Sequence, residues 1–185
     1  YKVNKGDGAF YGPKIDFHVN DSLNRKWQLG TIQLDMQMPQ RFEIKYIDKD
    51  NKEKVPFMLH RTILGSLERF VGILLEHYNG ALPVWLSPIQ TRVISFTNKN
   101  DKAVEKLVEK LKGFGLRTDF DIRNATVNEK VRDSELMRIP YIVVIGEKEE
   151  KSSTLAVRER GKKPKFGIRT EDFVRDVNER IKKRA

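Results

Sequence analysis

The stretch Pro56-Phe-Met-Leu-His-Arg-Thr-Ile-Leu-Gly-Ser-Leu-Glu-Arg-Phe70 decides how the first part of the chain folds. Its first residues are apolar and typical of a strand, and the Gly-Ser pair at residues 65 and 66 indicates a turn. The residues after the turn have the helical period, with apolar side chains at Leu67, Phe70, Val71, Leu74, Leu75 and Tyr78. This spacing predicts a helix with one apolar stripe packed against a core.

The start of this helix holds a cation where the helix dipole disfavours one. Ser66 can cap the helix, which places Arg69 in its first turn. An anion could therefore join Arg69, since terminal N–H groups and a guanidinium together suit a phosphate. Alternatively, Arg69 pairs with Glu68 or Glu76 on a solvated face. The local pattern leaves both interpretations open.

The residues around this stretch predict antiparallel strands. Residues 10–19 alternate between apolar and polar, and residues 27–34 pair with them in a hairpin. Residues 41–48 and 55–59 predict a second hairpin around a charged turn. The first half of the chain is therefore expected to be antiparallel β backed by one long helix.

The second predicted strand carries two glutamines, Gln28 and Gln33, which a buried strand would have to provide with partners. Their positions have opposite parity, so an ideal strand directs them to opposite faces. A bulge at Gly30 would let both face one site, and without it only one can be a ligand group. His60, at the end of the neighbouring strand, could be a structural histidine or a zinc ligand.

The pattern changes at the proline-containing stretch 82–88, so we expect a boundary between residues 83 and 84 and domains over 1–83 and 84–185. The second part has the order βαβαβ followed by ββα. The strands are expected at 91–96, 116–121, 141–145, 154–159 and 166–169, and the helices at 101–114, 126–138 and 170–183. This order predicts an α/β domain with a mixed, largely parallel five-stranded sheet flanked by helices.

Charge and composition point to a polyanionic partner for the second part. Residues 1–86 carry 12 Lys and Arg against 10 Asp and Glu, whereas residues 87–185 carry 24 against 16. The chain has no cysteine, no apolar run long enough to span a membrane and no signal peptide, so we expect a cytoplasmic protein without membrane contact. Tyr1 is not a natural start, and the chain is expected to be a fragment.

Several polar side chains of the second part follow its strands and helix starts. They are Arg123, Asn124, Arg132, Arg138, Glu147 to Glu150, Arg158 and Arg160. We expect them near the carboxyl ends of the parallel strands, where open α/β sheets place their ligands. Bases of single-stranded RNA are read by such amide, carboxylate and guanidinium groups, although a single arginine is usually only a surface charge.

Three motifs of the first part, Gly8-Ala-Phe-Tyr-Gly-Pro-Lys-Ile-Asp16, Trp27-Gln-Leu-Gly-Thr-Ile-Gln-Leu-Asp35 and His60-Arg-Thr-Ile-Leu-Gly-Ser-Leu-Glu-Arg69, closely resemble threonyl-tRNA synthetases. The last is similar to motif 3 of class II synthetases. Residues 84–90, 123–124, 138–141, 146–149 and 155–158 resemble the anticodon-binding domain of the same family. The resemblance implies part of a class II catalytic domain, in α+β form, followed by an anticodon-binding domain.

The resemblance also implies roles for single residues. Arg69 and Gln28 would contact ATP, which carries Mg²⁺, with Ser66 at the start of the same helix. Tyr11 and Gln33 would line the threonine pocket, and Lys14 would lie in the active site. His60 would be one of three protein ligands of a zinc ion that binds threonine. Asn124, Glu149 and Arg158 would read anticodon bases of tRNA(Thr), with Arg123 and Arg132 nearby.

The resemblance implies a threonine–tRNA ligase that works as a homodimer. The family's earlier catalytic half, with the other two zinc ligands, lies outside these residues, so the 185 residues alone are predicted to be inactive. The alternative is a non-enzymatic protein that binds tRNA or another nucleic acid on the same scaffold. A pure binder has no use for Lys14, Gln28, His60 and Arg69, which favours the enzyme.

Overall fold

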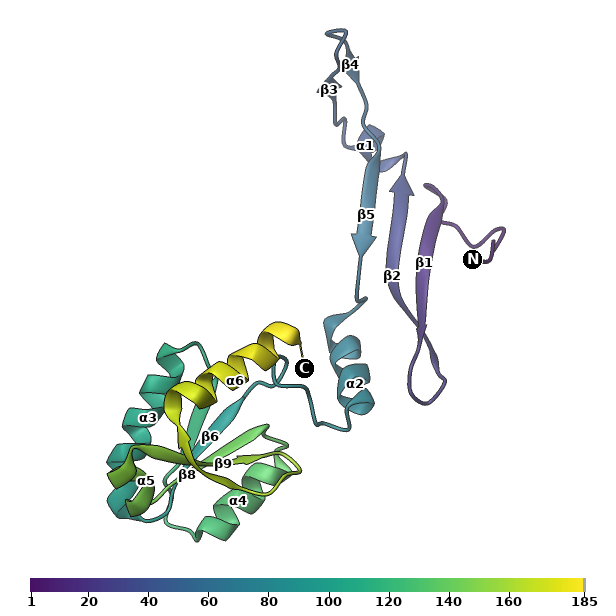
Figure 1. Cartoon of the computed structure of the whole chain (residues 1–185). Helices are drawn as coiled ribbons and strands as arrows, with labels where there is room; N and C mark the ends of the chain where they lie inside the picture. Colours follow the sequence, from purple (N-terminus) through teal and green to yellow (C-terminus); the bar gives the residue numbers. More distant parts are fainter. Residues whose placement is uncertain (185) are drawn as a thin grey trace. The chain divides into compact units, whose positions relative to one another are not determined.

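The computed structural model describes residues 1–184, and the chain forms two compact units, Tyr1–His77 and Tyr78–Ala185. The first unit is built on an antiparallel sheet in which β2 (Lys26–Asp35) lies between β1 (Lys14–Asn20) and β5 (Met58–Thr62) (Figure 1). The first predicted hairpin is therefore confirmed.

The second predicted hairpin is wrong in its extent. A short helix, α1 (Met38–Arg41), ends where a strand was to begin, and only β3 (Tyr46–Ile47) and β4 (Glu53–Lys54) pair with each other. Pro56 has no N–H to donate to a ladder, so the following strand, β5, begins only at Met58. That strand pairs with β2 rather than with the strand before it.

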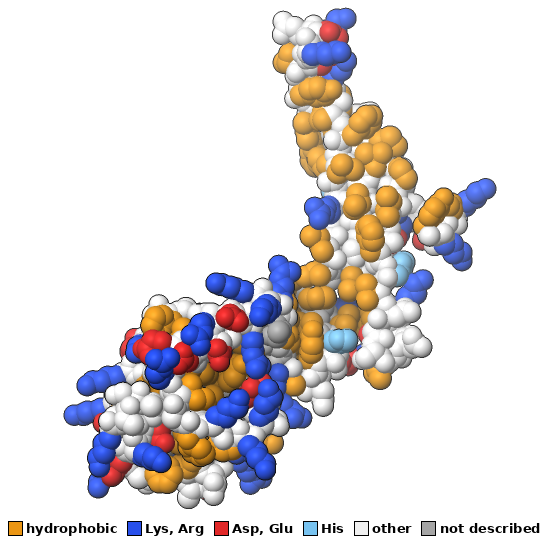
Figure 2. Space-filling view, viewed as in Figure 1, with side chains coloured by type: hydrophobic (Ala, Val, Ile, Leu, Met, Phe, Trp, Pro, Cys, Tyr) orange, Lys and Arg blue, Asp and Glu red, His pale blue; other side chains and the backbone are white. Residues whose placement is uncertain are grey.

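Helix α2 (Leu67–His77) begins at the predicted residue, and Ser66 Oγ accepts a hydrogen bond from the Arg69 N–H at 3.3 Å. The expected packing of its apolar stripe against a core is not found, because no residue of α2 is buried and Leu67 is 65% exposed. Figure 2 shows hydrophobic side chains gathered over this part of the chain. A three-stranded sheet and one helix are too small to cover both of their apolar faces.

The second unit contains the predicted mixed five-stranded sheet, in the order β10-β9-β8-β6-β7. Strands β6, β7 and β8 are parallel, whereas β9 is antiparallel to β8 and β10 to β9. The strands are β6 (Thr91–Ser95), β7 (Thr118–Asp121), β8 (Tyr141–Ile145), β9 (Thr154–Glu159) and β10 (Lys165–Arg169). The apolar strand β8 is central, as its composition predicts.

Helices cover both faces of this sheet (Figure 1). Helices α3 (Asp101–Gly113) and α6 (Thr170–Lys183) lie on one face, where their buried side chains form a core with Val93 and Val143. Helix α4 (Val127–Leu136) lies on the other face and begins with the predicted capping box of Thr126 and Glu129. The short helices η1 (Asn98–Asn100) and α5 (Glu147–Ser152) are not predicted by the sequence.

The residues that enter this unit are tied to it by hydrogen bonds. Arg160 Nη2 donates to the carbonyl oxygens of Ala81 and Leu82 at 3.1 and 2.8 Å, and Ser87 Oγ donates to the Leu82 oxygen at 3.1 Å. The domain boundary between residues 83 and 84 stays a prediction. Among residues 1–184, no helix is both long and apolar enough to cross a membrane.

Candidate functional site

A β-bulge interrupts the pairing of the first two strands. Phe17 lies opposite Gly30, but the next residue, His18, lies opposite Gln28, so Leu29 is the extra residue on β2. An extra residue shifts the alternation by one position, so side chains before and after it that would point apart come to share a face. The bulge that would unite the two glutamines is present, one residue before the expected glycine.

The side chains of Gln28 and Gln33 consequently lie on the same face of the sheet. Gln28 Nε2 donates to Thr31 Oγ1 at 3.1 Å and to Asp16 Oδ1 at 2.7 Å. Thr31 is two residues from Gln33, and Asp16 is two residues from Lys14, so these side chains share that face. Lys14 Nζ and Asp16 Oδ2 form an ion pair at 2.9 Å. The hydrogen bond to Asp16 raises the pKa of Lys14 and keeps it charged.

Tyr11 and His60 lie next to Gln33 on the same face. The Tyr11 hydroxyl donates to Gln33 Oε1 at 2.8 Å, and His60 lies opposite Gln33 in the β2–β5 ladder. The ring centroids of Tyr11 and His60 are 6.3 Å apart, and the two rings lie edge to face. Five predicted site residues, Tyr11, Lys14, Gln28, Gln33 and His60, are therefore gathered on one polar surface, which we call the polar sheet face.

The imidazole of His60 is oriented by a buried carboxylate. Its Nε2 lies 3.0 Å from Oδ2 of Asp35, which is 1% exposed, while the His60 side chain is half exposed. Burial acts to raise the pKa of Asp35, but hydrogen bonds from the Met38 N–H, His60 and the Gln37 N–H lower it below its ordinary value. If Nε2 carries the proton, Nδ1, which forms no hydrogen bond within residues 1–184, is available as a metal ligand. Within residues 1–184 no group of three His, Cys, Asp or Glu side chains could hold a metal.

Arg69 lies at the start of α2 and is not held by an acidic side chain. Its Nη2 donates to the carbonyl oxygen of Gln28 at 3.0 Å, and its guanidinium lies 5.9 Å from the Trp27 ring centre. Glu76 pairs with Arg25 instead. No carboxylate in residues 1–184 forms an ion pair with Arg69, so the guanidinium and the helix N-terminus can both contact an anion.

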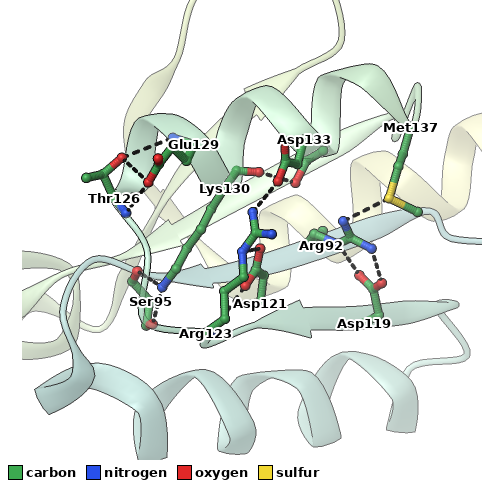
Figure 3. Close-up of polar contacts among 11 residues, drawn as sticks. Arg92, Ser95, Asp119, Asp121, Arg123, Thr126, Glu129, Lys130, Asp133 and Met137 are labelled. Carbon is green, nitrogen blue, oxygen red and sulfur yellow. Dashed lines mark hydrogen bonds and ion pairs between the residues drawn. The ribbon is translucent and has the colours of Figure 1, made fainter.

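In the second unit, a row of side chains crosses the face covered by α4. Arg92 lies opposite Asp119 on one side and Ile142 on the other, and Ile142 lies opposite Arg158. Arg92 and Asp119 form a two-pronged ion pair at 2.9 and 2.5 Å (Figure 3). That pairing raises the pKa of Arg92. Arg158 Nη2 pairs with Glu135 of α4 at 2.9 Å, with both side chains well exposed.

The expected position of Arg158 at the carboxyl ends of the parallel strands is wrong. It lies beside Ile142, the second residue of β8, because β9 returns antiparallel and reverses the direction of the chain. Arg138 and Arg160 are at the same amino-terminal end, where Arg160 Nη1 donates to the Arg138 oxygen at 2.7 Å and its N–H to the Pro140 oxygen at 2.8 Å.

The carboxyl end of the sheet does hold Arg123, Asn124 and Glu149. Arg123 follows β7 and is ion-paired with Asp121, at 3.3 Å, and with Asp133 of α4 (Figure 3). Its guanidinium therefore serves first to fix this loop to α4. The carboxyl end of β8 is three residues from Ile142, about 10 Å at roughly 3.3 Å per residue. The candidate residues thus span the length of a sheet face rather than one edge.

Asn124 and Arg132 are the freest of these side chains. Both are exposed, and neither forms a side-chain hydrogen bond or an ion pair with another residue of the described chain, 1–184. Glu149 is half-buried in the first turn of α5, where its Oε2 accepts a hydrogen bond from the Gly146 N–H at 3.2 Å. Amide, guanidinium and carboxylate groups offered together on a surface suit the edges of unpaired bases.

Two further residues of this region, Arg92 and Lys130, were missed by the sequence reasoning. Arg92 interrupts the apolar strand β6, and Lys130 is 1% exposed on the inner side of α4. In the sequence, both residues are charged at positions where the hydrophobic period predicts an apolar side chain. Such residues must find partners within the fold, which Arg92 finds in Asp119 and Lys130 in Ser95.

Comparison with protein families assigns each unit separately. Residues 1–78 match the model described as "tRNA synthetase class II core domain (G, H, P, S and T)". Residues 90–180 match the model described as "Anticodon binding domain". The two matches correspond to the polar sheet face with α2 and to the five-stranded sheet with its helices.

The chain is similar over its whole length to known proteins. It is 48% identical over 185 residues to a threonine–tRNA ligase of Desulforamulus reducens, covering 100% of this chain and 29% of that relative. A threonine–tRNA ligase of Acetivibrio thermocellus is 49% identical over 182 residues, covering 98% and 29%. The RNA binding domain of threonyl-tRNA synthetase from Cryptosporidium parvum has a TM-score of 0.81 at 38% identity, covering 95% of this chain and 44% of that one. The chain therefore spans about 29% of the length of these two ligases.

Proposed function

We propose that the whole protein is a threonine–tRNA ligase to which these residues contribute two sites, because the chain belongs to the threonyl-tRNA synthetase family. The reaction would join threonine to ATP as threonyl-adenylate and then transfer the threonyl group to tRNA(Thr). The polar sheet face would form part of the adenylation site, and the second unit would read the anticodon.

The observation that carries this proposal is the bulge at Leu29. It gathers Gln28 and Gln33 on one polar face with Lys14, a face that a regular strand would not have. A binding protein without chemistry has no need of such a polar surface on a sheet. In a synthetase, the same groups would position threonine and ATP, and positioning with electrostatic stabilisation is the protein's main contribution to in-line attack at phosphorus.

Arg69 and Gln28 would serve the nucleotide. The Arg69 guanidinium has no acidic partner in residues 1–184 and lies at a helix N-terminus, two features that suit a phosphate. Ser66 would fix this geometry by capping the helix. Tyr11 and Gln33, which are hydrogen-bonded to each other, would face the amino acid.

His60 would be one protein ligand of a zinc ion that binds the amino and hydroxyl groups of threonine. Because valine lacks the hydroxyl group, the zinc ion would distinguish threonine from valine. For its own part, the chain supplies the orientation of the ring, since Asp35 holds Nε2 and leaves Nδ1 without a hydrogen bond within residues 1–184. Mg²⁺ would accompany the ATP. A ligase of this kind would work in the cytoplasm, and the family resemblance implies a homodimer.

In the second unit, Asn124, Glu149 and Arg158 would read anticodon bases, with Arg132 nearby. Their distribution over about 10 Å of sheet face fits a short run of unstacked bases better than a single one. Arg123 would act mainly by holding the loop that carries Asn124.

Threonine-dependent exchange of pyrophosphate into ATP by the full-length protein tests this function. The wild-type protein is expected to exchange, and Arg69→Ala to lose roughly 10²- to 10³-fold, as for removal of one pre-organised charge-stabilising group. Arg175→Ala, which removes a surface arginine of α6, is the matched control and should leave the rate unchanged. Absence of threonine-dependent exchange in the wild type would exclude the ligase and leave a nucleic-acid-binding protein.

A further inference from the structure

An exposed aromatic ring lies at the carboxyl end of the second sheet, between β7 and β8. Phe96 directly follows β6, the strand that has β7 on one side and β8 on the other. Its side chain is 59% exposed, whereas the preceding Ser95 is 0% exposed and Asn100, four residues on, is 1% exposed. Residues 96–99 are exposed between these two buried residues, and Phe96 is the one among them that presents an aromatic ring to solvent.

The backbone that carries this ring is held on three sides. The Phe96 N–H donates to the carbonyl oxygen of Ile145 at 2.9 Å. Ser95 accepts two hydrogen bonds from Lys130 Nζ, at its carbonyl oxygen (3.3 Å) and its Oγ (3.2 Å), and Figure 3 shows Lys130 reaching from α4 to this residue. Thr97 Oγ1 donates to Asn100 Oδ1 at 3.0 Å. These hydrogen bonds order the backbone that carries the ring before any ligand arrives, which lowers the entropy lost on binding.

The ring lies close to a carboxylate that can read a base. A Cβ atom placed on Gly146 would be 3.5 Å from Phe96 Cβ, 3.7 Å from its Cγ and 3.1 Å from Glu149 Oε2. The absence of a side chain at Gly146 therefore leaves open the space between the ring and the carboxylate. Only Oε2 of Glu149 is used within residues 1–184, by the Gly146 N–H, so Oε1 can accept from a ligand.

We infer that Phe96 is a stacking platform for the base whose edge Glu149 reads. This inference rests on the proposed function, because it supposes that unpaired anticodon bases reach this edge of the sheet. Unpaired bases are recognised by a flat aromatic or guanidinium surface on one side and by hydrogen bonds at their edge. Phe96 and Glu149 supply one of each.

Lys130 holds the residue before the ring, although burial of a lysine without an acidic partner is unfavourable. A lysine that is 1% exposed is rarely found without an acidic partner, and this one donates only to the two oxygens of Ser95 within residues 1–184. The residue it fixes is the one immediately before Phe96.

Binding of the protein to a hairpin RNA with the anticodon stem and loop of a threonine tRNA tests the inference. Phe96→Ala should weaken binding roughly 5- to 150-fold, the loss of one base stacked on an aromatic ring. Phe96→Trp should bind as the wild type, whereas Phe96→Leu, which keeps an apolar side chain of similar size, should bind as Phe96→Ala. Phe166→Ala removes a ring that is 69% exposed on β10 and is the matched control, with unchanged binding expected.

A fluorescent base, 2-aminopurine, placed in turn at each anticodon position reports the stack directly. Its emission should be quenched by the wild type and the Phe96→Trp protein at one position, and much less by Phe96→Leu. A folded Phe96→Leu or Phe96→Ala protein that binds as the wild type would overturn the stacking role while leaving anticodon reading intact. If the wild type binds this hairpin and one with a scrambled loop equally, anticodon reading fails, and the stacking role with it.

Discussion

Replacing Gly12 by alanine is expected to damage the proposed adenylation site through the backbone alone. Gly12 lies against β2, and a Cβ at this position would be 2.1 Å from the carbonyl oxygen of Leu34, whereas real Cβ atoms essentially never approach closer than 3.0 Å. The two segments must therefore separate by about 0.9 Å at least. The clash is with backbone, so no rotation of a side chain can relieve it.

The separation acts on the two hydrogen bonds that hold this segment to β2. They join the Leu34 N–H to the Pro13 oxygen and the Met36 N–H to the Tyr11 oxygen, each at 3.1 Å. At roughly 0.5–1.5 kcal/mol each, their loss lowers the free energy of unfolding by about 1–3 kcal/mol. Tyr11 moves with the segment, and a misplacement of about 1 Å costs roughly 10²-fold in rate.

Pyrophosphate exchange and thermal unfolding of the full-length protein measure the two effects. Gly72→Ala is the matched control, because Gly72 is inside α2, nothing lies within 4 Å of the point that its Cβ would occupy, and alanine is favoured over glycine there by roughly 0.5–1 kcal/mol. That variant should exchange as the wild type and be no less stable. A Gly12→Ala protein with wild-type exchange and melting temperature would show that the segment adjusts, and that its fit to β2 does not hold Tyr11.

Three further perturbations test other parts of the structure. Arg158→Ala should weaken discrimination of tRNA(Thr) by roughly 1–3 kcal/mol per lost base contact while tRNA-free activation stays unchanged, whereas an equal fall in both would make Arg158 structural through Glu135. His60→Ala should lower the zinc content of the full-length protein measured by metal analysis, and equal content would remove His60 from the ligand set. The pKa of Asp21 is lowered to about 2, because hydrogen bonds from Trp27 and Arg25 outweigh the effect of burial. The ionised carboxylate therefore stabilises the folded state fully above the ordinary pKa of 3.8, and this stabilisation is lost as the pH falls through about 2. Asp21→Asn should therefore be less stable than the wild type at pH 7, and the difference should shrink as the pH falls toward about 2 in acid unfolding followed by Trp fluorescence. A difference that is as large at pH 2 as at pH 7 would contradict this.

Hydrophobic period predicted the second unit well because that unit encloses its own core. The strand β8 is apolar throughout and central, and the apolar positions of α3, such as Val104 and Val108, are buried. In the first unit the same kind of pattern in α2 predicted burial that is not found, with Leu67 65% exposed. Period shows which face of an element is apolar, but it carries no information about which part of the chain covers that face.

The position of a strand in the sheet is a property of pairing, which a local pattern does not contain. Arg158 was expected at the carboxyl end of the parallel strands on the strength of its neighbours in sequence. In the structure the antiparallel return of β9 places it beside Ile142. The residues of β5 were likewise assigned to a hairpin with the preceding strand, whereas they pair with β2 from Asp35 back to Thr31.

The candidate sites lie where the chain departs from regular strand alternation or from the helical hydrophobic period. The bulge at Leu29 cannot be predicted from alternation, since alternation assumes that no residue is added, and yet Gln28 and Gln33 share a face only because of it. Lys130 occupies a position that the helical period reserves for an apolar side chain. Each departure costs stability locally and is retained only if the surrounding hydrogen bonds determine one arrangement. A strand that carries two amides of opposite parity, or a helix with a lysine in its apolar stripe, is therefore more informative about function than the regular segments on either side.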